Sequence, residues 1–273
     1  MHKTAKQNQV LLTLIAILAA VLVLVILAAV SITTSDEPEP TETTSASTAA
    51  TENVTTPPVT TEDPGPDLSL YPPKLVELLT KNPETEKFVL EYFTAKDKEY
   101  VIDISNYGRD TVPLFLQWDQ RWGYIQYGTD VAGLTACGPT CLAMVGYYLT
   151  GDPYYSPDKM MQFATQNGYC TPGGGTPWIL FSQGGVQLGF KVTELPLDKN
   201  RIRNNLQIGV PIVCSMGPGI FTTTGHYIVL TGWEDGKIRI NDPNSIANSE
   251  KLWTYEEIKS QIRNLWAFQV PQS

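Results

Sequence analysis

Histidine and cysteine are scarce in this chain of 273 residues, which has two histidines and four cysteines. They are His2, His226, Cys137, Cys141, Cys170 and Cys214. The clustered Cys-x2-Cys spacing of structural zinc sites is missing, so we expect no metal site and no cofactor. Cys137 and Cys141 are one helical turn apart and would not cross-link distant segments. The sequence leaves open whether Cys170 and Cys214 form a disulfide.

Basic residues are also few, and none of them cluster. The chain has 19 Lys and Arg against 28 Asp and Glu, a net charge of −9. Eight of the acids lie in residues 33–67, and from residue 68 onward 17 basic and 20 acidic side chains leave a net charge of −3. No basic stripe is present, which argues against a nucleic-acid partner. No wall-binding repeat or basic wall-binding segment is visible either.

The one long apolar run lies near the N-terminus. Residues 10–30 are apolar apart from Thr13 and carry no charge, so we predict a transmembrane helix over residues 10–32. Lys3 and Lys6 precede it and the next basic residue is Lys74. This asymmetry predicts that residues 1–9 lie in the cytoplasm and that everything after residue 32 lies outside the cell. The alternative is a signal peptide cleaved at Ala28-Ala29-Val30-Ser31, whose apolar core would normally be shorter.

Residues 33–67 consist almost entirely of Thr, Ser, Glu, Asp, Pro, Ala and Val. This composition buries too little apolar surface to offset its ordering entropy, so we predict a disordered stalk. A helical extension is then expected over residues 68–104 and a globular, monomeric domain over residues 105–273. Helices are predicted at 72–79, 82–92, 157–168, 176–189, 201–208 and 254–264, and strands at 100–104, 211–216, 226–233, 237–240 and 266–270. Helices precede antiparallel strands, so the fold class is α+β.

The centre of the domain is the stretch Thr135-Ala136-Cys137-Gly138-Pro139-Thr140-Cys141. Leu142, Val145 and Leu149 follow at helical spacing, and Gly151 offers a stop. With Pro139 at the first helical position, Cys137 would lie just before the first turn. Free N–H groups and the helix dipole favour an anion there, so Cys137 is the candidate nucleophile.

A histidine and a carboxylate are expected to meet in the strand-rich half. Asp235-Gly236 between two apolar runs predicts a β-hairpin, with His226 at the start of its first strand and Asp242 at the end of its second. These ends are neighbours in an antiparallel hairpin. Asp242 is therefore predicted to orient the His226 imidazole towards Cys137, while Asn241 would point to the opposite face.

An aromatic-rich segment, residues 112–124, precedes the cysteine helix. Core packing is the interpretation we favour for the rings of Trp118 and Trp122. The Gln117 amide is a candidate oxyanion donor, with Gln120 and Gln126 as rivals. Trp118, Gly138 and Gly225, which adjoin the candidate catalytic residues in the sequence, are predicted to contact the substrate.

Several motifs resemble those of papain-like cysteine peptidases related to the bacteriocin-processing, double-glycine group, cysteine peptidase family thirty-nine and its relatives. They are Gln117-Trp118-Asp119, Arg121-Trp122-Gly123-Tyr124, Ala136-Cys137-Gly138-Pro139-Thr140-Cys141, Gly225-His226-Tyr227-Ile228-Val229-Leu230 and Asp242-Pro243-Asn244. The similarity runs from Tyr71 to Phe268 and is greatest to membrane-anchored Gram-positive members. The resemblance implies a papain-like fold, with Cys137 as nucleophile, His226 as base, Asp242 as orienting group and Gln117 as oxyanion donor. It also implies that Cys141 is structural.

The sequence thus predicts a membrane-anchored extracellular cysteine peptidase that hydrolyses peptide bonds in a peptide or protein substrate. The alternatives are a peptidoglycan amidase or endopeptidase with the same triad, and a papain-like domain that binds peptides without cleaving them. Ala136 stands where such peptidases often have Gly, and the exporter segments of bacteriocin processors are absent. Cleavage after a double glycine is therefore not implied.

Overall fold

The computed structural model describes residues 65–173 and 175–271. The predicted cytoplasmic segment, the predicted membrane span at 10–32 and almost all of the predicted stalk lie outside these residues. Within the two described ranges, no helix combines the length and the apolar character needed to cross a membrane.

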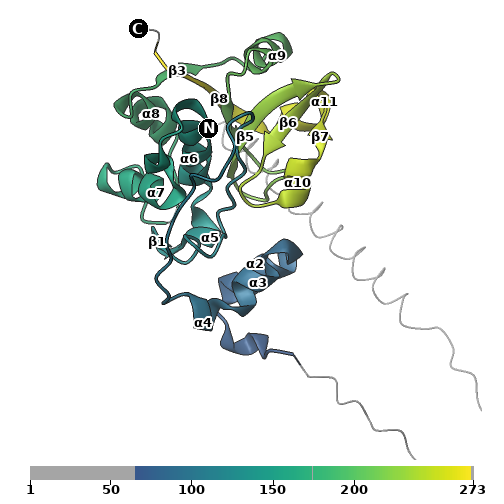
Figure 1. Ribbon diagram of the computed structural model, residues 1–273. Coiled ribbons are helices and arrows are strands. Elements are labelled where there is room, and N and C mark those ends of the chain that lie inside the picture. Colours follow the sequence, from purple (N-terminus) through teal and green to yellow (C-terminus); the bar gives the residue numbers. More distant parts are fainter. Residues whose placement is uncertain (1–64, 174, 272–273) are drawn as a thin grey trace, which may run out of the picture. The chain divides into compact units, whose positions relative to one another are not determined.

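The main sheet is antiparallel and lies in the C-terminal half (Figure 1). Its strand order is β3-β8-β4-β5-β6-β7. The strands are β3 (Lys191–Glu194), β4 (Ile212–Met216), β5 (His226–Glu234), β6 (Lys237–Asn241), β7 (Leu252–Trp253) and β8 (Ile262–Gln269). A separate short pair is formed by β1 (Gln126–Tyr127) and β2 (Asp130–Val131).

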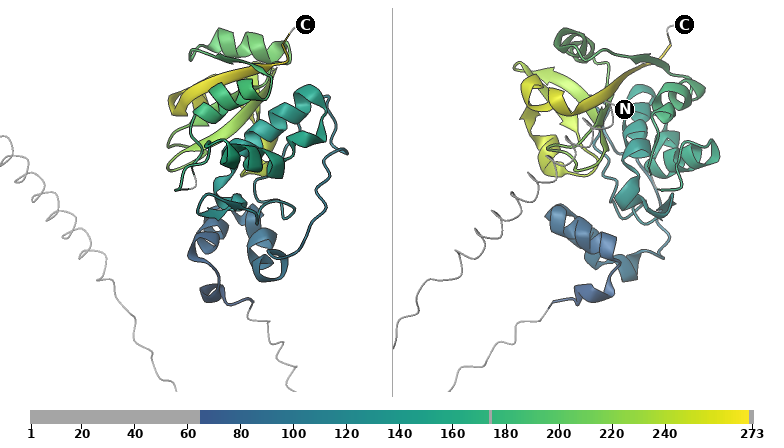
Figure 2. Two further views of the ribbon diagram at one scale, coloured as in Figure 1. Left: turned by 90° about the vertical axis from the view of Figure 1, so that its left-hand side faces the viewer. Right: turned by 180° about the vertical axis from the view of Figure 1, so that it is seen from behind.

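Helices pack against both faces of the main sheet (Figures 1 and 2). In the domain they are α5 (Ala132–Thr135), α6 (Cys137–Thr150), α7 (Pro157–Gln166), α8 (Gly185–Gln187), α9 (Lys199–Gln207), α10 (Ile246–Glu250) and α11 (Tyr255–Ile258). Residue alternation along β4 assigns each side chain to a face. Val213 packs in the core with α6 and α7, whereas Ile212 and Cys214 pack in the core with α9. The sheet therefore supports the cysteine helix on one face only.

The N-terminal extension is helical and packs on the domain. It contains α2 (Pro73–Lys81), α3 (Glu86–Leu90) and α4 (Tyr92–Ala95). Leu75, Phe88 and Val89 are buried in a cluster that also takes in Trp118 and Leu134 of the domain. Asn82 ends α2, and its side chain accepts the backbone N–H of Glu84 at 3.1 Å, so one residue closes a helix and caps the next turn.

Three local predictions are confirmed with their expected chemistry. Asp235 and Gly236 have φ of 49° and 78° and make the tight turn between β5 and β6. Gly151 ends α6 with φ of 73°. Thr254 and Glu257 form the predicted capping box.

Other element predictions are wrong at particular residues. Residues 100–104 have no regular structure, and the second predicted helix breaks at Glu91 into α3 and α4. The helix predicted to reach residue 264 gives way at Ile262, because residues 262–269 pair with both β3 and β4. Strands β3 and β7 and helix α10 were not predicted. Helices before antiparallel strands remain the order of the fold, so the predicted α+β class is confirmed.

Candidate active site

Cys137 is the first residue of α6, whereas the sequence predicted that the helix would begin at Pro139. Pro139 is the third residue of the helix rather than the first, so Cys137 lies within the first turn. The first N–H groups of a helix have no partner within it, which makes this end attractive to an anion. Cys141, one turn later, is fully buried, and burial raises the pKa of its thiol well above the usual value. Of the two thiols, only Cys137 reaches the surface.

The start of α6 is pressed against the segment at Thr176. A Cβ atom on Gly138 would lie 2.7 Å from the Thr176 Cβ atom, closer than side chains normally approach. Two tyrosine hydroxyls hold Thr176 in place. The Tyr227 hydroxyl donates to its carbonyl oxygen at 2.6 Å, and the Tyr127 hydroxyl lies 2.9 Å from its Oγ1. Gly138, predicted to contact substrate, is thus also a packing position.

His226 and Asp242 form a buried pair, as expected from the β-hairpin predicted at Asp235-Gly236. His226 Nε2 lies 2.7 Å from Asp242 Oδ1, and the two side chains are 8% and 1% exposed. Strand β5 has nine residues and β6 has five. A bulge between Leu230 and Gly232 shifts the pairing register of the two strands by one residue. Val229 then pairs with Asn241, so Asp242 comes next to the first residues of β5.

The Asp242 carboxylate has two hydrogen-bond partners besides His226. Oδ1 also accepts the backbone N–H of Asn244 at 2.9 Å, and Oδ2 accepts Nδ2 of Asn248 at 2.8 Å. The Asp242 backbone N–H donates to Ser249 Oγ at 2.9 Å. Burial opposes its charge, but His226 and these hydrogen bonds lower the pKa of Asp242 below its usual value.

The imidazole is stabilised as a cation. Burial disfavours its charge, but the Asp242 carboxylate and, after it, the Cys137 side chain raise the pKa of His226 from 6.5 to about 10. Because Nε2 is engaged by Asp242, Nδ1 is the ring nitrogen left to interact with Cys137. The three predicted residues therefore form one electrostatically coupled set.

A cleft of about 430 Å³ opens onto this set, and we call it the central cleft. Its lining includes Cys137, His226 and Gly225 of the predicted residues. The other lining residues are Leu134, Thr135, Gly173, Gly175, Thr176, Trp178, Ser215, Thr224 and Tyr227. Trp178 Nε1 donates to Ser215 Oγ at 3.1 Å, which links the part of the lining that contains Trp178 to strand β4.

Gln117 and Trp118 are not among the lining residues of the central cleft. Gln117 is 4% exposed, and its Nε2 donates to the Gly133 carbonyl oxygen at 2.8 Å. One Nε2 hydrogen remains for another acceptor. Trp118 packs with the N-terminal extension, and its Nε1 donates to the Asn244 carbonyl oxygen at 3.1 Å. The structure thus gives Trp118 the packing role that the sequence favoured for its ring.

The alternative candidates for the oxyanion donor and for the partner of His226 form hydrogen bonds away from the central cleft. Gln120 Nε2 donates to Glu91 Oε2 at 2.8 Å, and Gln126 Nε2 donates to the Gly128 carbonyl oxygen at 3.2 Å. Asn241 Nδ2 donates to the carbonyl oxygens of Val112 and Pro113, at 2.9 and 3.0 Å. Asn241 is therefore a buried tether rather than a partner of His226.

Asn248 is the functional residue that sequence reasoning missed. It contacts Asp242 because residues 243–247 fold back. Asp242-Pro243-Asn244 indicates a turn, but the local pattern does not show which later side chain the turn brings to the carboxylate. Within the described ranges, no group of three His, Cys, Asp or Glu side chains is arranged to hold a metal ion. All four cysteines are free thiols, so Cys170 and Cys214 are not joined.

Comparison with known proteins places this site in a family. No curated protein matches the chain in sequence. The chain is similar to the solved peptidase domain of Streptococcus ComA, a bifunctional ABC transporter involved in a quorum-sensing pathway. The identity is 23%, the match covers 50% of this chain and 93% of that chain, and the TM-score is 0.38. It is also similar to a C39-like peptidase from Bacillus anthracis, at 17% identity over 65% of this chain and 100% of that chain, with a TM-score of 0.35.

A profile of the Peptidase C39-like family matches residues 109–273, a range that includes Cys137, His226 and Asp242. The match begins later than the resemblance from Tyr71 suggested, and leaves the N-terminal extension outside it. On this match, which covers more than half of the sequence, the chain belongs to the Peptidase C39-like family.

Proposed function

We propose that this protein is a cysteine peptidase in which Cys137, His226 and Asp242 hydrolyse a peptide bond. The observation that carries the proposal is the 2.7 Å contact between His226 Nε2 and Asp242 Oδ1, which leaves the other ring nitrogen to Cys137 at the edge of an open cleft. A peptide-binding module would need none of these three groups. The intact set therefore favours catalysis.

The chemistry follows the two steps of acyl transfer. The Cys137 thiolate attacks the carbonyl carbon of the substrate and forms a C–S bond, while negative charge moves to the carbonyl oxygen. The His226 imidazolium gives its proton to the leaving nitrogen as the C–N bond breaks. His226 then takes a proton from water, whose oxygen attacks the acyl carbon, and the C–S bond breaks to release the acid.

The oxyanion needs donors that are fixed before it forms. Free N–H groups in the first turn of α6 supply one kind of donor. We assign the second to the remaining Nε2 hydrogen of Gln117, whose amide orientation is fixed by the Gly133 carbonyl oxygen. Its backbone N–H donates to the Pro243 carbonyl oxygen at 2.7 Å, which ties Gln117 to the loop after Asp242.

The setting of the reaction is proposed from the sequence. The apolar run over residues 10–30 is preceded by Lys3 and Lys6 and followed by a Thr-, Ser-, Glu- and Pro-rich segment. This pattern supports a single-pass membrane anchor over residues 10–32 with the domain outside the cell. The substrate would then be an extracellular peptide or protein.

The test is alkylation of the full-length protein with iodoacetamide, followed by peptide mapping. We expect rapid modification of Cys137 at neutral pH, and slow modification of Cys170, which is also partly exposed and whose thiol pKa is raised by burial. His226→Ala should remove the difference. Equal, slow labelling of Cys137 and Cys170 in the wild type would exclude an activated nucleophile and favour the binding module.

A further inference from the structure

Two hollows continue the central cleft towards the N-terminal extension. The first, which we call the middle hollow, has about 330 Å³ and shares Leu134, Thr135 and Gly173 with the central cleft. The second, which we call the apolar pocket, has about 510 Å³ and shares Lys74, Asp130 and Leu134 with the middle hollow. Because adjacent hollows share lining residues, we treat the three as one groove that begins at Cys137.

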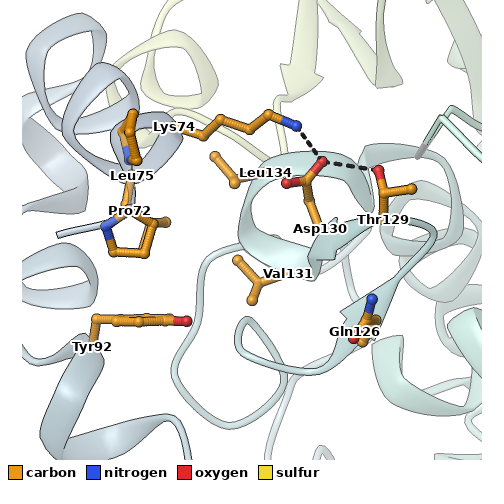
Figure 3. Close-up of a pocket in the computed structure, with 10 residues that line it drawn as sticks. Pro72, Lys74, Leu75, Tyr92, Gln126, Thr129, Asp130, Val131 and Leu134 are labelled. Carbon is orange, nitrogen blue, oxygen red and sulfur yellow. Dashed lines mark hydrogen bonds and ion pairs between the residues drawn. The ribbon is translucent and has the colours of Figure 1, made fainter.

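The apolar pocket is suited to a hydrophobic side chain. Figure 3 shows Leu75, Tyr92, Val131 and Leu134 around its interior, with the ion pair of Lys74 and Asp130 along the rim. Lys74 Nζ and Asp130 Oδ2 are 2.6 Å apart, so these charges neutralise each other. The middle hollow adds Glu77 and Lys81 to this ion pair, so four of its lining residues are charged.

We propose that the apolar pocket is a substrate subsite, which takes a large apolar side chain of the polypeptide whose scissile bond lies at Cys137. This rests on the proposed function. The part of the substrate between this side chain and the scissile bond would cross the middle hollow. Pro72, Leu75 and Tyr92 lie before residue 109, outside the family match, so this wall belongs to the extension and would give the peptidase a preference of its own.

The test uses a synthetic library of random peptides long enough to cross all three hollows, with cleavage products read by mass spectrometry. We expect an apolar preference at one position remote from the cleaved bond. Val131→Trp, which fills the pocket, should abolish that preference, and Tyr92→Ala, which enlarges it, should shift it towards larger side chains. Ile125→Trp is the matched control, in a hollow that shares no lining residue with the groove.

The same library bound to Cys137→Ala separates this inference from the proposed function, because binding needs no catalysis. Apolar enrichment that Val131→Trp removes supports the subsite even if the wild type cleaves nothing. Cleavage or binding profiles that Val131→Trp leaves unchanged would overturn it, and would leave the pocket to another occupant, such as a second segment of this chain.

A separate set of hydrogen bonds joins the N-terminal extension to Asp242. The Glu84 carboxylate accepts the backbone N–H groups of Ile246 and Ala247, at 2.7 and 2.8 Å, from the first turn of α10. Asn82 Nδ2 donates to the Asn244 carbonyl oxygen. Helix α10 carries Asn248 and Ser249, the residues that hold the side chain and the backbone of Asp242.

We infer that Asn82 and Glu84 are positioning residues, which act on His226 through α10 and Asp242. Glu84 accepts hydrogen bonds from two N–H groups at the start of α10 that have no partner within the helix, and its negative charge is favourable at a helix N-terminus. Without it, the segment that presents Asn248 loses its attachment to the extension. Asp242 would then hold His226 less firmly.

The NMR titration of the His226 imidazole tests this, since full-length protein contains one other histidine, His2. We expect Glu84→Ala to lower the pKa of His226 clearly, and Glu84→Asp to restore part of the shift. The matched control is Glu86→Ala, an exposed carboxylate on the first turn of α3. A pKa of His226 that is the same in Glu84→Ala and wild type would refute the assignment, even if Glu84→Ala is less stable or less active. The titration needs no substrate, so it is independent of whether the protein cleaves peptides.

Discussion

Gly138 and Thr176 approach so closely that no side chain fits between them. The Cβ position of Gly138 lies within 2.8 Å of three Thr176 side-chain atoms. Thr176 is itself anchored by Tyr127 and Tyr227, so it cannot retreat without breaking their hydrogen bonds. The contact fixes the distance between the nucleophile helix and one wall of the central cleft.

Gly138→Ala should therefore damage both stability and activity. Overpacking of this kind costs about 1–3 kcal/mol of unfolding free energy, and we expect kcat to fall because Thr176 and the first turn of α6 move apart. Gly108→Ala is the matched control: a Cβ atom there would meet nothing within 4 Å, and Gly108 lines none of the three hollows of the groove. Urea unfolding and peptide cleavage measure the two effects. Equal behaviour of the two variants would contradict the steric argument.

The charge of His226 gives the stability a defined pH dependence. Its pKa is raised on folding, from 6.5 to about 10, so the folded state binds the imidazolium proton more tightly. The stabilisation is complete below pH 6.5 and is lost as pH rises to about 10. Asp242, whose pKa is lowered on folding, contributes above its usual value of 3.8 and loses its contribution as pH falls through its folded pKa. Together they should stabilise the fold most between these two limits.

The measurement is the free energy of unfolding of the wild type minus that of His226→Gln, followed across the alkaline range. We expect this difference to shrink steadily between pH 6.5 and about 10. A difference that stays constant over this range would mean that the imidazole is not held as a cation.

Gln117→Ala tests the oxyanion assignment. Loss of one oxyanion donor lowers kcat by about 10²–10³-fold, and KM should change little because the donor acts on the transition state. The Gly133 carbonyl oxygen also loses its partner, which costs about 1–3 kcal/mol of stability. Gln120→Ala, which removes a bond to Glu91 instead, should leave kcat unchanged. A Gln117→Ala variant that is destabilised but turns over normally would reduce Gln117 to a structural role.

The candidate triad could be predicted from sequence because each of its members is placed by local chemistry. Asp235-Gly236 fixes the hairpin, the hairpin brings His226 to Asp242, and the turn into α6 exposes Cys137. The chain holds only one histidine beyond residue 2, which left no other imidazole to choose.

The supports of the triad could not be predicted in this way. Glu84 meets Ile246 across 162 positions, and Thr176 meets Gly138 through tertiary packing alone. Residues 262–264 were predicted to continue the helix that begins at Thr254, yet pairing with β4 extends β8 back to Ile262. At residues 262–264 tertiary pairing overrode the local preference, and the other two contacts join segments far apart in the sequence, which local patterns do not reveal.

Asp242→Asn separates the charge of the third residue from its shape. The amide keeps an oxygen for His226 Nε2, and rotation of the Asn248 amide can supply an acceptor to the new NH₂ group. The imidazolium loses its counter-ion, so the pKa of His226 should fall from about 10 towards 6.5, and the alkaline limit of kcat/KM should fall with it. Asp242→Ala, which removes shape and charge together, should also lose His226 orientation and lower kcat by about 10²–10⁴-fold at every pH.

The pH profiles of the two variants decide between these roles. If Asp242→Asn and Asp242→Ala are equally impaired at every pH, the negative charge itself is indispensable. If Asp242→Asn keeps the wild-type alkaline limit, the charge on Asp242 is not what holds the proton on His226.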